Sequence, residues 1–285
     1  MRSFIPAYQM KTPRDLGEAL SILATEPEAW KPFAGGTDLM VLLESGKLAD
    51  RNYVNIWDLE ELRGIEVTDD RISLGALTTY TDVQAHPILR EEFPMLCQAA
   101  AETGGLAIQN RGTIGGNIVN ASPAADSPPA LLAYDAELEL ISVKGTRRVA
   151  YRDFHTGYKQ MLIQPHELLS SVHLLRSKNR LHQYYRKVGT RKAQAISKVC
   201  FSGVAQVEGR MINEIRIALG SVAPIPLRCV RTEAALRGRP VDDFSAGIEA
   251  LEKEISPIDD TRSTRDYRLR VSLNLLKDFM SELGS

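Results

Sequence analysis

Residues 33–40 read FAGGTDLM and place two adjacent glycines between a short apolar strand and a predicted helix. KPFA, at 31–34, is short enough for one buried strand, and Gly46 has the position of a residue that ends a helix. Because glycine has no Cβ, the pair fits either a plain tight turn or a point where a ligand approaches the backbone. As turn punctuation alone, the pair favours the simple turn by roughly three to one.

A ligand held at this first glycine loop (residues 34–38) would be an anion. The N–H groups of Gly35 and Gly36 can point at one spot, and the start of a helix adds a partial positive charge. Thr37 can add a hydroxyl donor. Asp38 fits a helix cap better than a phosphate contact, because a carboxylate repels a phosphate.

A second glycine loop (residues 111–117) reads RGTIGGN and repeats this chemistry. It offers a hydroxyl at Thr113, glycines at 115 and 116 and an amide at Asn117, and Asp126 follows nine residues later. Each loop alone is a weak signal. Together they could hold two linked phosphates by backbone donors from opposite sides, which would suit a dinucleotide without a Rossmann fold.

Around these loops the pattern predicts an α+β protein. A first segment ends near residue 57, a second runs to about 175, and the polar run RSKNR at 176–180 is a candidate boundary. The regular alternation of a doubly wound parallel sheet is missing. Helices are predicted at 12–25, 81–93, 94–104, 231–238, 244–255 and 266–284, and strands at 64–77, 166–175, 195–207 and 211–222.

Composition excludes several classes of function. The chain has 285 residues, 44% of them hydrophobic, and a formal net charge of -1, so no long-range field attracts nucleic acid or an anionic membrane. No apolar run is long enough for a signal peptide or a membrane span. The scattered cysteines Cys97, Cys200 and Cys229 favour a reducing cytoplasm over a disulfide framework or metal site.

Familiar catalytic motifs are also missing. The sequence has no P-loop, no G-x-G-x-x-G after a strand, no G-x-S-x-G elbow and no H-E-x-x-H. We therefore predict no catalytic side chain and no metal ligand on this chain. The five histidines are interpreted as surface or satisfied core residues.

In combination, the two loops resemble the FAD-binding, or medium, subunits of the molybdenum hydroxylases, which include xanthine, nicotinate and carbon monoxide dehydrogenases. The resemblance covers essentially the whole chain, and its specificity lies in the set of motifs rather than in any one. The family motifs are AGGTD (34–38), TIGGN (113–117), ASPAAD (121–126) and RKAQAIS (191–197). Within the family, the similarity is closest to bacterial xanthine dehydrogenase FAD subunits, through ELRGI (61–65), FHTG (154–157) and SVAPIPLRC (221–229).

This resemblance implies a two-subdomain FAD-binding domain of the vanillyl-alcohol oxidase (PCMH) type over residues 1–176, with subdomains at about 1–57 and 58–176. A smaller α+β domain of the CO dehydrogenase flavoprotein type would follow over 177–285. FAD would lie between the two subdomains.

The resemblance also implies the cofactor contacts. Asn120 and Asp126 would reach the sugar or ribityl part of FAD, Leu169 would lie along the adenine or ring system, and Lys187 would contact the flavin. The segment at 99–113 has no aromatic residue to stack on the flavin. The pyrophosphate would lie between the two loops, formed by Lys31, Pro32, Phe33, Ala34, Gly35, Gly36, Thr37 and Asp38 and by Thr113, Ile114, Gly115, Gly116 and Asn117.

By the same resemblance, the chain is the flavin module of a cytoplasmic xanthine dehydrogenase-like oxidoreductase of purine metabolism. A partner subunit with a molybdenum cofactor would oxidise the substrate, and a partner with iron–sulfur clusters would pass electrons to FAD. NAD or another acceptor would then receive them, in a dimer of heterotrimers. The alternatives are a nicotinate, aldehyde or carbon monoxide dehydrogenase, or a flavin-free assembly protein with the same fold.

Overall fold

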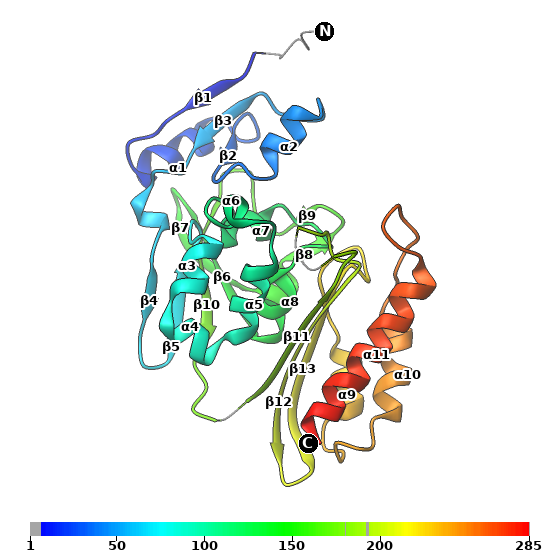
Figure 1. The fold of residues 1–285 in the computed structure, drawn as a ribbon. Coiled ribbons are helices and arrows are strands. Elements are labelled where there is room, and N and C mark those ends of the chain that lie inside the picture. The colour runs from blue at the N-terminus through cyan, green and yellow to red at the C-terminus, as the bar shows by residue number, and fades with distance from the viewer. Residues whose placement is uncertain (1–6, 180, 192–193, 285) are drawn as a thin grey trace.

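The computed structural model describes residues 7–179, 181–191 and 194–284. Three units follow one another along the chain, each with its own sheet (Figure 1). We call them the N-terminal unit (residues 7–62), the central unit (residues 63–175) and the C-terminal unit (residues 182–284).

The N-terminal unit contains a three-stranded parallel sheet in the order β1 (Gln9–Lys11), β3 (Asn52–Asn55), β2 (Lys31–Phe33). Two α-helices, α1 (Leu16–Thr25) and α2 (Leu39–Glu44), accompany the sheet, and a 3-10 turn, η1 (Glu60–Leu62), ends the unit. Helix α1 begins at Asp15, whose side chain accepts a hydrogen bond from the Glu18 N–H at 2.8 Å. The helix thus begins later than the range 12–25 that the sequence predicts.

A five-stranded antiparallel sheet forms the base of the central unit. Its order is β4 (Ile65–Val67), β5 (Arg71–Gly75), β10 (Leu168–Leu175), β6 (Glu137–Ser142), β7 (Gly145–Ala150). Apolar side chains of β5, β6 and β10 form one core with the helices on one face of the sheet. These helices are α3 (Tyr80–Ala85), α4 (Pro87–Glu92), α5 (Pro94–Glu102), α7 (Ile114–Val119) and α8 (Ser127–Ala133). A short helix outside this core, α6 (Leu106–Gln109), contacts α3.

Two predictions for this unit need correction. The single helix predicted at 81–93 is two helices, because Pro87 cannot continue a helix and instead begins α4 at its first position. The second glycine loop is not only loop, because it ends a glycine-rich stretch at 104–117 that contains the short helices α6 and α7. After η2 (Tyr151–Asp153), a small hairpin of β8 (His155–Gly157) and β9 (Gln160–Met161) lies beside α7.

The C-terminal unit has a four-stranded antiparallel sheet, in the order β11 (His182–Val188), β12 (Val199–Glu208), β13 (Met211–Gly220), β14 (Leu227–Arg228). Helices α9 (Val230–Leu236), α10 (Ser245–Glu254) and α11 (Arg265–Leu283) share a core with one face of this sheet. The other face packs on α8 and α5 of the central unit. Strand β12 is buried from Val199 to Ala205 because it is covered on both faces.

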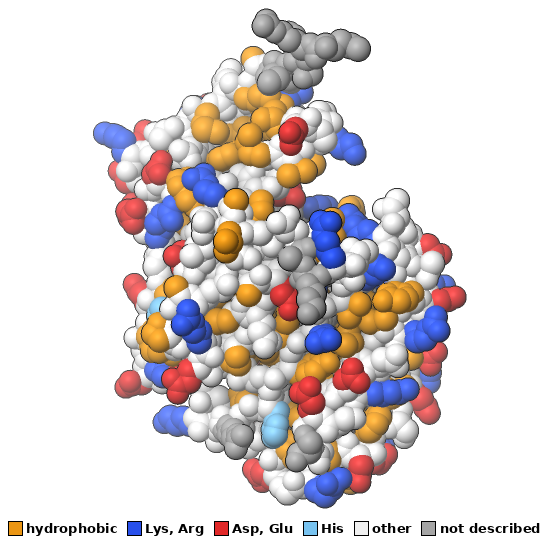
Figure 2. Space-filling model, in the orientation of Figure 1, with side chains coloured by type: hydrophobic (Ala, Val, Ile, Leu, Met, Phe, Trp, Pro, Cys, Tyr) orange, Lys and Arg blue, Asp and Glu red, His pale blue; other side chains and the backbone are white. Residues whose placement is uncertain are grey.

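In the central and C-terminal units, strands and helices are segregated along the chain, as the sequence predicts for an α+β protein. In the N-terminal unit they alternate, as β1, α1, β2, α2, β3, around a parallel sheet. Charges of both signs are intermixed over the face that Figure 2 shows. Of the helices in the described ranges, none is long and apolar enough to cross a membrane.

Candidate functional site

Two cavities meet where the three units come together. The first, which we call the loop cavity, has a volume of about 580 Å³ and is lined by both glycine loops. The second, the interdomain cavity, has a volume of about 1210 Å³ and is lined by all three units. Both are lined by Thr37, Asp38, Tyr80, Asn117 and Asn120, so they form one continuous cleft.

The first glycine loop lines this cleft and has backbone donors without a partner among the described residues. It connects β2 to α2, and Gly36 takes a left-handed conformation with φ of 76°. From Gly35 to Asp38, four consecutive N–H groups donate to no acceptor among the described residues. The same four residues line the loop cavity. Successive free amides beside a cavity form a site for an anion.

Asp38 occupies the cap position of α2, as predicted, but its side chain makes no capping hydrogen bond. The α2 amides are therefore not blocked by the carboxylate.

The second glycine loop uses its backbone donors within the protein. The N–H groups of Ile114 and Gly115 each donate at 2.9 Å, to the carbonyls of Thr78 and Ala76 respectively. The Gly116 N–H donates to the Thr113 hydroxyl and the Asn117 N–H to the Thr113 carbonyl, both at 3.0 Å. The second loop therefore does not offer the free backbone donors that the sequence predicts. Its N–H groups already donate to acceptors in the protein, and two of them hold the loop against the segment before α3.

Close packing explains two of the four glycines. A Cβ on Gly35 would lie 1.7 Å from the carbonyl oxygen of Arg111, so only glycine lets the two loops touch. A Cβ on Gly115 would lie 2.7 Å from both Cβ and O of Ala76. The Gly35–Gly36 pair thus has a third explanation: Gly36 turns the chain, and Gly35 leaves room for the second loop to pack against it.

The structure brings most of the predicted site residues to one cleft. The loop cavity is lined by Lys31, Pro32, Ala34, Gly35, Gly36, Thr37, Asp38, Thr113, Gly116, Asn117, Asn120 and Leu169. Asp126 lines the interdomain cavity. Four predicted residues line neither cavity: Phe33, Ile114, Gly115 and Lys187.

Lys187 lies behind the cavity wall in a buried ion pair. Its ammonium is 2.8 Å from Asp126 Oδ2 and donates to the Glu102 carbonyl at 2.7 Å. The other carboxylate oxygen of Asp126 accepts from Ser197 Oγ at 2.6 Å. Burial raises the pKa of Asp126, and the Lys187 charge opposes this rise. Direct contact between Lys187 and a flavin therefore stays a prediction, since this geometry places Asp126 at the wall.

Two lining residues were missed from the sequence. Tyr80, the first residue of α3, is buried and lines both cavities, and burial raises the pKa of its phenol. It supplies an aromatic ring that the segment at 99–113 lacks. Lys159, in the turn between β8 and β9, lines the loop cavity. Neither residue belongs to a sequence motif.

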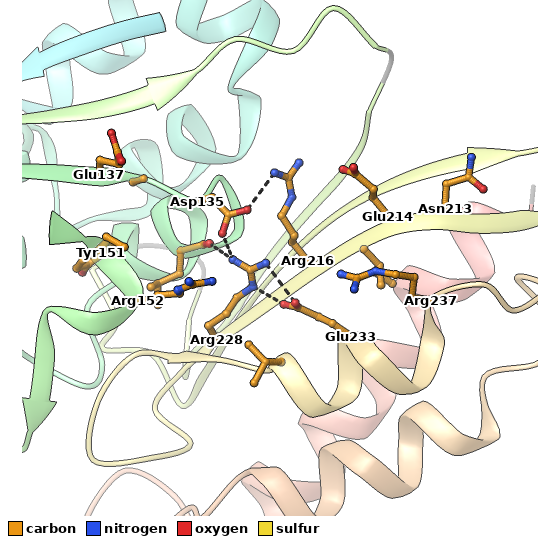
Figure 3. A pocket seen from close by; sticks show the side chains of 15 residues that line it. Asp135, Glu137, Tyr151, Arg152, Asn213, Glu214, Arg216, Arg228, Glu233 and Arg237 are labelled. Carbon is orange, nitrogen blue, oxygen red and sulfur yellow. Dashed lines mark hydrogen bonds and ion pairs between the residues drawn. The ribbon is translucent and has the colours of Figure 1, made fainter. Parts of the chain in front are cut away.

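A third cavity, of about 780 Å³, lies between β13 and α9 on one side and the end of α8 on the other (Figure 3). Arg228 points between Asp135 and Glu233 and bonds to both, while Arg216 is 3.2 Å from Asp135. These central charges are satisfied by one another, so this cavity joins two units rather than offering a free site. In the described part of the chain, no group of three His, Cys, Asp or Glu residues could hold a metal ion.

Comparison with known proteins agrees with this architecture. Residues 6–174 match the family model described as the FAD binding domain in molybdopterin dehydrogenase, and residues 183–283 match the CO dehydrogenase flavoprotein C-terminal domain. The chain is 33% identical to the putative xanthine dehydrogenase FAD-binding subunit of Escherichia coli strain K12, over 94% of this chain and 92% of that protein. Its identity to the carbon monoxide dehydrogenase medium chain of Hydrogenophaga pseudoflava is 27%, over 95% of each.

Among solved structures, carbon monoxide dehydrogenase from Hydrogenophaga pseudoflava superposes with a TM-score of 0.92 at 27% identity, covering 96% of both chains. Quinoline 2-oxidoreductase from Pseudomonas putida 86 shares the fold, with a TM-score of 0.89 at 24% identity and 98% coverage of both chains. These matches confirm the predicted fold class and the prediction of FAD as the cofactor of this chain.

Proposed function

Since this chain belongs to the FAD-binding, or medium, subunits of the molybdenum hydroxylases, we propose that it is their flavin electron-transfer module. It receives electrons from an iron–sulfur partner subunit and passes them to NAD or another acceptor. A second partner, with the molybdenum cofactor, oxidises the substrate. Its similarity to xanthine dehydrogenase subunits supports a purine as that substrate.

The observation that carries the proposal is the row of four N–H groups from Gly35 to Asp38, which have no acceptor among the described residues and belong to residues that line the loop cavity. The residues fit FAD, whose diphosphate needs such donors and whose flavin and adenine need flat, largely apolar space on either side. The loop cavity provides apolar walls at Leu77, Leu169 and Ile56. The flavin ring has room in the interdomain cavity, beyond Tyr80 and Asn117.

When bound, FAD supplies the chemistry that links single-electron donors to two-electron acceptors. The residues of this chain then hold and orient the cofactor. The first loop binds the anionic centre, Asn120 and Asp126 line the path to the ring, and the buried phenol of Tyr80 lies where the two cavities meet. No side chain is assigned as nucleophile, general acid or general base.

An apolar rim supports docking of the iron–sulfur partner at the interdomain cavity. Six exposed apolar side chains line this cavity: Val41, Leu106, Ile108, Tyr158, Ile196 and Ile258. Exposed apolar side chains gathered around one opening are typical of a protein interface. A donor seated there would lie beside the flavin ring. In our proposal this heterotrimer pairs into a dimer and works in the cytoplasm.

The proposal is tested by the visible spectrum of the purified chain, followed by identification of the cofactor that denaturation releases. We expect a yellow protein that releases FAD in near-equal amount, and whose flavin is bleached by NADH without oxygen. A colourless chain that also fails to take up added FAD would overturn the proposal and favour a flavin-free assembly protein. FAD retention with no response to NADH would remove NAD alone from the proposal.

A further inference from the structure

The β8–β9 hairpin carries a lysine in an unfavourable conformation at the edge of the loop cavity. Its strands are joined by a two-residue turn, Tyr158–Lys159, and Lys159 has φ of 57°. A left-handed backbone costs a non-glycine residue about 1–2 kcal/mol, and such turns favour glycine or asparagine. Strain of this kind persists where the surroundings fix it, and it is often found at functional sites.

The hairpin is anchored so that the turn cannot drift away from the cleft. The imidazole Nε2 of His155 donates to the Ile118 carbonyl in α7 at 3.0 Å. At the other end of the hairpin, Met161 packs against the central core and lines the loop cavity. The turn is therefore held beside the C-terminal end of α7.

The Lys159 ammonium contacts Asn120, three residues beyond the second glycine loop. It donates to the main-chain oxygen of Asn120 and, at 2.8 Å, to Asn120 Oδ1. Burial lowers the pKa of Lys159, and the nearby carboxylate of Asp38 opposes this change. Asp38 ends the first loop and Asn120 follows the second, so the ammonium lies near the ends of both loops.

The charges lining the loop cavity show why a cation matters there. Four carboxylates line it: Glu28, Asp38, Asp50 and Glu167. Only Glu167 is neutralised by an arginine, Arg147, at 2.6 Å. A diphosphate entering this cavity would add negative charge to an acidic wall. Lys31 and Lys159 are the described cations that line the cavity and can offset this charge.

We propose that Lys159 binds the diphosphate of FAD, and that Asn120 holds its ammonium in place for this contact. This inference rests on the proposed position of FAD in the cleft. If Lys159 served only to cap α7, its contact with the Asn120 carbonyl would be sufficient, since a cation is favourable at a helix C-terminus. The strained turn and the exposure of the side chain to the loop cavity point beyond that role.

The test compares Lys159→Met and Lys159→Arg with the wild-type chain, using FAD and riboflavin as separate probes. Riboflavin has the flavin ring without any phosphate. Loss of a hydrogen bond to a charged group predicts roughly 10- to 100-fold weaker FAD binding in Lys159→Met. Riboflavin affinity should not change, and Lys159→Arg should bind FAD nearly as well as wild type. Lys144→Met, at the exposed turn between β6 and β7, is the matched control.

Two results would overturn the role of Lys159. The first is unchanged FAD affinity in Lys159→Met, and a lower melting temperature of the FAD-free protein alongside it would indicate a cap alone. The second is an equal loss of FAD and riboflavin affinity, because it indicates a contact with the ring. A wild-type chain that binds no FAD would instead overturn the proposed function, and this inference with it.

Discussion

The two glycine loops of the cleft use their backbone in opposite ways. In the first, four consecutive N–H groups have no partner among the described residues and line the loop cavity. In the second, the N–H groups from Ile114 to Asn117 all donate to protein acceptors. The sequences AGGTD and TIGGN look alike, yet one loop is open to a ligand and the other holds the fold. The two roles differ in whether the backbone N–H groups donate within the protein or are left without a partner.

The largest expected effect comes from the ion pair behind the second loop. In Lys187→Met, Ser197 is the one described residue whose side chain still donates to the buried Asp126 carboxylate. Breaking a buried pair predicts a loss of about 3–5 kcal/mol in the free energy of unfolding of the FAD-free protein, measured with urea. Adding Asp126→Asn should restore much of this loss. Unchanged stability with weaker FAD binding would instead support direct contact between Lys187 and the flavin.

A smaller effect is expected when the second loop is forced away from its acceptors. In Gly115→Ala, the new Cβ would lie 2.7 Å from the Ala76 carbonyl, which is backbone and cannot rotate away. We expect the FAD-free protein to lose about 1–3 kcal/mol of stability, as overpacked cores do. Gly17→Ala, in α1, meets only Asp15 Oδ1 at 3.3 Å and is the control. A loss of FAD affinity without a loss of stability would contradict the structural role of this loop.

In the first loop, by contrast, a substitution should lower mainly FAD affinity rather than stability. In Gly36→Ala, the new Cβ would lie 2.6 Å from the Phe33 ring and displace the free amides. FAD affinity should fall about tenfold, near 1.4 kcal/mol. Gly46→Ala is a matched control, because Gly46 has a similar φ of 70° and a Cβ there meets nothing within 4 Å.

Both alanine variants should share the modest loss of stability that a left-handed backbone imposes. The comparison of the loops fails if Gly36→Ala and Gly46→Ala bind FAD equally well.

The smallest effect is a pH dependence of stability that comes from His155, which contacts α7 just after the second loop. Burial lowers the pKa of His155, which contacts the Ile118 carbonyl, below its ordinary 6.5. Between that lowered pKa and 6.5, the unfolded chain binds a proton that the folded chain does not. This contribution to stability is therefore complete above pH 6.5 and is lost as the pH falls towards the lowered pKa.

His155→Gln should lessen this loss of stability in acid, as measured by melting temperature from pH 7 to pH 5. A residual loss is expected from His173, whose pKa is also lowered by burial. An identical pH profile in wild type and His155→Gln would show that the contact does not sense acid.

Much of the fold could be predicted from local pattern. The hairpin at 64–77, the paired strands β12 and β13 and the three C-terminal helices follow from apolar periodicity and turn residues. The two short helices in the glycine-rich stretch could not, because glycine is a poor helix former and each helix depends on tertiary contacts. The break at Pro87 was readable in the sequence, since proline favours the first turn.

For the site, the positions of the two loops could be predicted from the sequence, but which loop has free N–H groups could not. Whether an amide of the second loop is free depends on the carbonyls of Ala76 and Thr78, which lie more than thirty residues earlier in the chain. Lys159 gave no signal, being one of 35 Lys and Arg residues without a motif around it. The family resemblance supplied Asp126 and Lys187, and the structure adds that they are paired.

The contact between Gly35 and Arg111 also sets an order of events during synthesis. The carbonyl of Arg111 fills the place of a side chain at Gly35, and its guanidinium lies 3.8 Å from the centre of the Trp57 ring. The first loop thus takes its shape against a residue that leaves the ribosome 76 positions later. A nascent chain that ends before the central unit contains Gly35 and Gly36 but lacks the Arg111 carbonyl that packs against Gly35. If FAD binds at the proposed site, its capture reports that both units have folded against each other, and a fragment ending near residue 62 should remain colourless.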